Sequence, residues 1–95
     1  MKTLRKGDTG SEVKHLQDAL NIAGSKLDID GDFGKLTEEA VTRFQIEYGL
    51  TPDGIVGDKT WKILDLVTLW EAYKLTMNTI YKLPAVKRLE EVIYG

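Results

Sequence analysis

The 95-residue sequence contains no cysteine, a single histidine and two prolines. Without cysteine there is no disulfide framework, no thiolate nucleophile and no thiolate metal ligand. His15, the only histidine, has no second histidine or cysteine with which to form a zinc site or a nucleophile–base pair. We therefore expect His15 to be an ordinary helix residue, and we expect neither a metal nor a cofactor.

The chain also lacks a surplus of positive charge. It has 13 Lys and Arg residues against 15 Asp and Glu residues, which gives a net charge of −2 and an isoelectric point near 5.3. The basic residues are scattered along the sequence and do not form a stripe that would neutralise phosphates. No nucleic-acid partner is expected.

Long apolar runs are missing as well. Residues 1–8 carry positive charges but not the apolar segment of about 7–15 residues that a secretory signal needs. The most apolar stretch, residues 63–83, is interrupted by polar side chains that hydrocarbon would not tolerate, namely Asp65, Glu71, Lys74, Asn78 and Lys82. We expect no membrane insertion, and no signal peptide is visible in this chain.

What the sequence does contain is a repeated glycine pattern. The motif G-x-x-G-x-x-[VT] begins at Gly7, Gly31 and Gly54, and in the last two copies an aspartate, Asp30 or Asp53, precedes the first glycine. Such a period marks one supersecondary unit that is used more than once. Paired glycines favour a sharp turn that leads into a helix N-terminus with unpaired N–H groups. We expect function to concentrate at these loop-to-helix junctions.

Apolar residues at helical spacing follow each copy of the motif and predict an all-α protein. The expected helices cover residues 11–23, 35–48 and 58–83, the third being unusually long. Pro84 then predicts a break before a short last helix over residues 85–94. No Pro-, Gly- or Ser-rich linker divides the chain.

Catalysis has little support in the sequence. The carboxylate pairs Glu38/Glu39 and Glu90/Glu91 are each formed by neighbours on a predicted helix. Their side chains point in different directions, whereas glycoside hydrolysis needs two carboxyl groups that face each other across about 5–10 Å. We interpret them as solvated helix faces and expect no intrinsic enzymatic activity.

A calcium-binding loop is a more specific candidate function than catalysis. Asp28, Asp30 and Asp32 occupy positions 1, 3 and 5 of an EF-hand pattern, and Glu39 falls at position 12. Position 6, however, is Phe33, where the sharp turn requires glycine. Because the glycine repeat already explains this segment, we expect no ordered calcium site.

Several stretches of the first two thirds of the chain match one known pattern: LRKGDTGSEV at residues 4–13, DGDFGKLT at 30–37, AV at 40–41, FQ at 44–45 and GLTPDGIVGDKTW at 49–61. Together they closely resemble the peptidoglycan-binding domain that accompanies cell-wall hydrolases. The resemblance implies a three-helix module over residues 1–64 that attaches to peptidoglycan without catalysis. Residues 65–95 do not match and are expected to form a helical extension with an extended third helix and an additional C-terminal helix.

The resemblance also implies a shallow groove near the second loop and helix, which accepts the stem peptide and amino sugar of peptidoglycan. Mapped onto this sequence, the candidate ligand-binding residues are Asp30, Phe33, Gly34 and Thr37, with Arg43 and Tyr48 as weaker candidates on the same helix. A helix N-terminus offers N–H groups to the carboxylates of stem peptides. With few contacts, binding would be on the order of micromolar to millimolar, and many copies would be needed for retention.

Single residues of this region have structural interpretations that the sequence leaves open. Phe33 either fills the core or forms an aromatic platform for a sugar or peptide. Thr37 and Thr60 either cap their helices or bind ligand. Gln17 and Gln45 are expected to tie loops to helices through buried hydrogen bonds, and the repeat glycines are expected to be mainly architectural.

The extension supplies the alternative function. It carries more apolar side chains than one helix keeps exposed, including Trp70, Tyr73, Met77, Ile80 and Tyr81. Either residues 65–95 pack on the module, with the long helix and the last helix folded back on each other, or they mediate self-association or bind a protein partner. In the second case the chain is an interaction or assembly protein. The wall-binding interpretation predicts a cell-wall, extracellular or phage-associated location.

Overall fold

A computed structural model describes residues 2–81, and the side chains of residues 2–77, of this chain. It contains α1 (Ser11–Ile22), α2 (Lys35–Glu47) and α3 (Asp58–Tyr81), and no β-strand forms among the described residues. The all-α prediction is confirmed, with helix starts as expected and the ends of α1 and α2 one residue earlier. The predicted helix over residues 85–94 lies outside the described residues.

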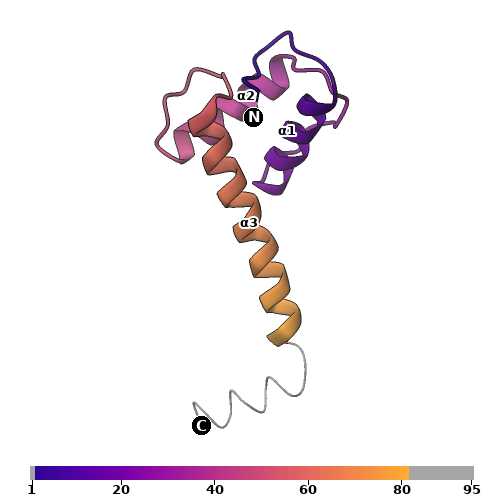
Figure 1. Ribbon diagram of the computed structural model, residues 1–95, viewed down its shortest axis with the longest axis vertical. Coiled ribbons are helices and arrows are strands. Elements are labelled where there is room, and N and C mark those ends of the chain that lie inside the picture. The colour runs from indigo at the N-terminus through magenta and orange to yellow at the C-terminus, as the bar shows by residue number, and fades with distance from the viewer. Residues whose placement is uncertain (1, 82–95) are drawn as a thin grey trace.

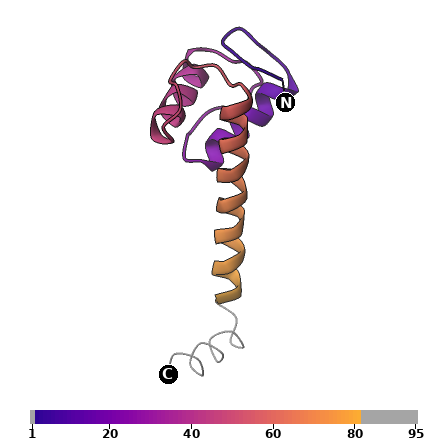
Figure 2. The same ribbon diagram turned by 60° about the vertical axis from the view of Figure 1, so that its left-hand side comes forward.

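The first half of α3 packs with α1 and α2 into a head, and the second half projects beyond it (Figures 1 and 2). α1 contacts both other helices. The predicted boundary between residues 64 and 65 falls inside α3, which continues through it without a break. Its 24 residues give a helix of about 36 Å.

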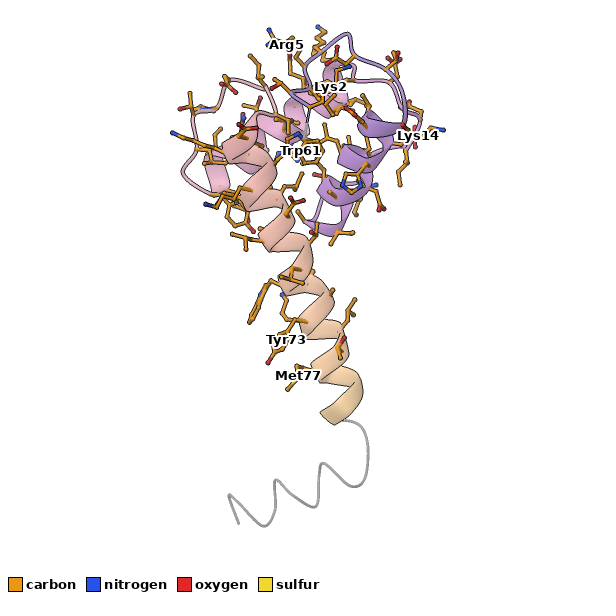
Figure 3. The ribbon with its side chains drawn as sticks, viewed as in Figure 1. Lys2, Arg5, Lys14, Trp61, Tyr73 and Met77 are labelled. Atoms are coloured by element: carbon orange, nitrogen blue, oxygen red, sulfur yellow. The ribbon has the colours of Figure 1, made fainter. Side chains whose placement is uncertain are left out.

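The core of the head comes from one face of each helix and from the loops between them. Val13, Leu16 and Leu20 of α1 recur at the spacing of a single helix face. The complete buried apolar set is Leu4, Val13, Leu16, Ala19, Leu20, Phe33, Ala40, Val41, Phe44, Val56, Trp61 and Leu64. The indole ring of Trp61 is buried, and its Nε1 donates to the Lys2 carbonyl at 2.9 Å (Figure 3).

The N-terminal segment joins the loops that precede α2 and α3. Leu4 forms an isolated antiparallel bridge with Val56, with N–H···O distances of 3.1 and 2.8 Å. Further along, the Gly7 N–H donates to the Phe33 carbonyl at 2.9 Å, and the Phe33 N–H donates to the Asp8 carbonyl at 3.0 Å. The first copy of the motif therefore lies against the second copy and braces the loop that leads into α2.

Candidate functional site

The buried side chain of Gln17, on α1, holds the loop before α2 in place. Its Nε2 donates to Asp30 Oδ1 at 3.0 Å, to the Asp32 carbonyl at 3.1 Å and to Thr37 Oγ1 at 3.2 Å. Its Oε1 accepts from the Gly31 N–H at 2.9 Å. A primary amide has two donor hydrogens, so the three acceptors share them. We call this arrangement the first cradle.

The same arrangement recurs around Gln45, on α2, and holds the loop before α3. Nε2 of Gln45 donates to Asp53 Oδ1 at 3.0 Å, to the Ile55 carbonyl at 2.9 Å and to Thr60 Oγ1 at 3.2 Å. Its Oε1 accepts from the Gly54 N–H at 2.9 Å. We call this arrangement the second cradle. The predicted role of both glutamines as buried ties is confirmed.

Each cradle requires a glycine at the position that donates to the glutamine oxygen. Gly31 and Gly54 have φ values of +77° and +73°, a conformation that side-chain-bearing residues rarely adopt. A Cβ at Gly31 would lie 3.1 Å from the Gly10 carbonyl oxygen, and one at Gly54 would lie 3.1 Å from Glu38 Cγ. At these two positions the predicted architectural role of the repeat glycines is confirmed.

The hydroxyl groups of Thr37 and Thr60 belong to the cradles. Each accepts from its glutamine at 3.2 Å, and both threonines are buried. α2 begins at Lys35, and its N-cap residue Gly34 provides no side-chain cap. The interpretation of these threonines as helix caps is therefore wrong, because the glutamine reaches their hydroxyls from the neighbouring helix.

Hydrogen bonds within the cradles lower the pKa of both cradle aspartates. The pKa of Asp30 is lowered by the hydrogen bond from the Asp32 N–H and then by that from the Gln17 amide. The pKa of Asp53 is lowered in the same way, first by the Ile55 N–H and then by its own cradle glutamine. In Asp30 these bonds all use Oδ1, so Oδ2 receives none from the described residues. Oδ2 can accept a hydrogen bond from a ligand.

A depression of about 250 Å³ opens over the first turn of α2. It is lined by Gln17, Lys26, Leu27, Asp28, Asp30, Asp32, Gly34, Lys35, Leu36 and Thr37. The backbone N–H groups of residues 35–37 have no acceptor among the described residues, as is usual at the start of a helix. The depression thus combines helix-terminal donors with a carboxylate, flanking lysines and the 72% exposed side chain of Leu36.

A similar depression, of about 270 Å³, opens over the first turn of α3. It is lined by Gln45, Leu50, Thr51, Asp53, Ile55, Gly57, Asp58, Lys59 and Thr60. The two depressions are related by the sequence repeat, and they differ in the charged side chains on their rims.

Gly34 and Gly57 are glycines that the backbone does not require. Neither has a φ in the left-handed region, and a Cβ at either position would meet no atom within 4 Å. For this pair the structure shows no steric need for glycine. Each lines its depression, and the absence of a side chain leaves the helix N-terminus open.

The structure brings together three of the six predicted site residues, Asp30, Gly34 and Thr37, in the first depression. Phe33 does not join them as an aromatic platform. Its side chain is 1% exposed and belongs to the core of the head. Of the two interpretations that the sequence left open, the core interpretation is the correct one.

The two weaker candidates lie elsewhere on α2. Arg43 lines a neighbouring depression that shares Lys26, Leu27 and Leu36 with the first, so it borders the site without entering it. Tyr48 is the C-terminal cap residue of α2, at the opposite end of the helix from Gly34. Its ring packs against Phe44 with a centroid distance of 4.7 Å.

Part of the lining of the first depression was not predicted from the sequence. Lys26 and Leu27 come from the loop after α1, while Lys35 and Leu36 form the start of α2. The last two have a sequence signal, because they fill the variable positions between the second glycine and the threonine of the motif. The first two have none, since the folding of the loop alone brings them to the rim.

Residues 2–81 contain no group of three or more His, Cys, Asp and Glu side chains placed to hold a metal ion. None of the helices in this described range combines the length and apolar character needed to span a bilayer.

Two short helices and the first half of a long one, two glutamine cradles and shallow open depressions define a small all-α module with candidate ligand sites. A family described as putative peptidoglycan binding domain matches residues 9–64. The zinc D-Ala-D-Ala carboxypeptidase of Streptomyces albus G is 45% identical over 64 residues, covering 62% of this chain and 24% of that protein. This chain belongs to the putative peptidoglycan binding domain family.

Solved structures agree with this assignment. The Burkholderia AP3 phage endolysin is similar with a TM-score of 0.68 and 51% identity, over 68% of this chain and 25% of that one. The SleB N-terminal domain is similar with a TM-score of 0.69 and 35% identity, over 70% of this chain and 93% of that one. The chain therefore corresponds to about a quarter of the carboxypeptidase and the endolysin, and to nearly all of the SleB domain.

Proposed function

We propose that residues 1–64 attach this chain to bacterial peptidoglycan without catalysis, and that the first depression holds the ligand. The observation that carries the proposal is the open first turn of α2, with its unpaired N–H groups, within a chain that belongs to the peptidoglycan-binding family. The proposed location is the bacterial cell wall, in an extracellular or phage-associated setting.

The chemistry of the first depression fits a stem peptide attached to an amino sugar. The N–H groups of residues 35–37 and the positive end of the α2 dipole attract a peptide carboxylate. Asp30 Oδ2 accepts from an amide or hydroxyl group, while the exposed Leu36 side chain offers an apolar contact to a sugar face. Because the site is shallow, we expect dissociation constants on the order of micromolar to millimolar.

Co-sedimentation of the purified chain with peptidoglycan sacculi tests the function. Retention on Gram-positive or Gram-negative sacculi, with no retention on chitin, is the expected result. No retention on either kind of sacculus would refute wall attachment, whatever the location of the site.

Gly34→Ala tests the location of the site. The added methyl group enters open space at the rim of the first depression, and the backbone φ of −98° suits alanine. We expect sacculus binding to weaken roughly tenfold, equivalent to about 1.4 kcal/mol. The melting temperature should change little, because Gly→Ala at a compatible φ reduces the entropy of the unfolded chain, whereas alanine is a poorer N-cap residue than glycine.

Gly57→Ala is the matched control, because it makes the same change at the second depression. We expect its wall affinity to equal that of the wild type. If Gly57→Ala weakens binding and Gly34→Ala does not, the ligand lies in the second depression, and the proposed site is wrong although wall attachment stands.

A further inference from the structure

The projecting half of α3 exposes apolar side chains on several faces, Leu69 and Leu75 among them. Four others form a continuous stripe that the wall-binding site does not use. Leu66, Trp70, Tyr73 and Met77 follow one another at intervals of four, three and four residues, which is the a/d spacing of a coiled coil. Ile80 continues the spacing in the sequence. We call the first four residues the α3 seam.

The seam faces away from the head. At 3.6 residues per turn its four positions fall within an arc of about 60°. By the same geometry Trp61 and Leu64, which anchor α3 in the core, lie about 150° around the helix axis. Figure 3 shows Tyr73 and Met77 projecting from the same side of α3 below the head.

The seam side chains are large and accessible. Leu66 is 55% exposed, Trp70 56% and Tyr73 53%, and Met77 is half-buried. The rings of Trp70 and Tyr73 stack with a centroid distance of 5.6 Å. Lys74 Nζ lies over the Trp70 ring at 6.0 Å from its centroid, and more than half of the surface of that ring residue is still exposed. The head therefore leaves the stripe open to another molecule.

We propose that the α3 seam binds a second copy of this chain. A heptad stripe is complemented by another helix with the same spacing, and an identical copy provides it. The only charged residues within 66–77 are Glu71 and Lys74. They pair with each other at 3.0 Å, so the seam offers no net charge to attract a charged partner or to repel a copy.

The accessible area suits a weak pair of helices. Aromatic side chains bury about 150–250 Å² each, so the half-exposed Trp70 and Tyr73 offer about 200 Å² together. The smaller side chains of Leu66 and Met77 together add about 100 Å² of accessible apolar area. Two copies then bury about 600 Å² of apolar area, or about 1,000 Å² in all if 60% of the interface is apolar. This is the lower limit for a specific interface, so we expect micromolar association.

The mass of the full 95-residue chain in solution tests the proposal. In sedimentation velocity from about 1 μM to about 1 mM, the mass should rise from 10.7 kDa toward twice that value. Tyr73→Glu puts a charge in the centre of the seam and should weaken the dimer at least about tenfold. Circular dichroism should show unchanged helix content, because this side chain contributes nothing to the core.

Ala72→Glu is the matched control. It adds the same charge to the next residue of α3, which is exposed and lies about 130° from the seam centre. This variant should dimerise as the wild type does. A wild type that stays monomeric at every concentration would overturn the proposal. The partner of the seam would then be residues 82–95 or a different protein. A dimer that Tyr73→Glu and Ala72→Glu leave equally intact would overturn it as well.

Discussion

At the scale of single residues, two glutamines organise the molecule. Gln17 and Gln45 are buried polar side chains whose four hydrogen bonds each run to a loop and to the following helix. A buried amide is costly unless its groups are paired, and here every one of them is. The cradles thus fix the first turns of α2 and α3, over which the depressions open.

Replacing a cradle glutamine should therefore be strongly destabilising. Gln17→Leu keeps the side-chain size but leaves the Gly31 N–H and the Thr37 hydroxyl without their partner. At about 1–3 kcal/mol for each buried group left unsatisfied, we expect a loss of about 2–4 kcal/mol in the free energy of unfolding. Chemical denaturation measures it. Lys14→Leu, at an exposed position on the same helix, is the control and should change stability by less than about 0.5 kcal/mol.

The sequence predicted the cradle glutamines but not the direction of every loop side chain. A glutamine beside apolar helix residues is recognisable, because the helical period places it on the buried face. A loop has no such period, so nothing in the sequence separates an inward Phe33 from an outward one. The contact between Gln17 and Asp30 depends on how the loop folds back onto α1, which the sequence does not encode locally.

At the scale of the helices, glycine positions and apolar spacing were sufficient to place all three starts. α2 begins directly after Gly34, and α3 begins directly after Gly57, as the repeat predicted. The candidate site was only half predictable. Three predicted residues that lie close in sequence meet at the start of α2, namely Asp30, Gly34 and Thr37. Tyr48 was predicted as a site residue because it belongs to the same helix, but it lies at the C-terminal end of α2. A helix of 13 residues separates its ends by about 20 Å.

The two tryptophans of α3 separate its anchored half from its projecting half. Trp61 is buried, bonded to Lys2 and stacked on His15 at 5.7 Å, so Trp61→Ala should lower the free energy of unfolding by about 3–5 kcal/mol. Trp70→Ala removes an equal side chain from the exposed seam and should cost less than about 1 kcal/mol. Thermal unfolding of both variants at a concentration where the chain is monomeric provides the comparison. Equal losses would contradict the packing of α3 described above.

At the scale of the whole molecule, the head and the projecting half of α3 have separate tasks in our proposals. The head binds wall weakly, because its depressions are shallow and its ligand contacts are few. The seam joins two heads through the half of α3 that projects away from α1 and α2 (Figure 1), so neither task interferes with the other. Two weak sites on one dimer reach the same wall at an effective concentration in about the millimolar range.

This arrangement predicts that the seam strengthens wall binding without touching the wall. Tyr73→Glu should leave the affinity for a soluble stem-peptide fragment unchanged, because the first depression is intact. Its apparent affinity for sacculi should fall by about 10–100-fold, since a monomer loses the second attachment. Gly34→Ala, by contrast, should weaken binding to the fragment and to sacculi alike. Equal retention of wild type and Tyr73→Glu on sacculi, at concentrations where only the wild type is dimeric, would show that the two heads do not bind the wall together.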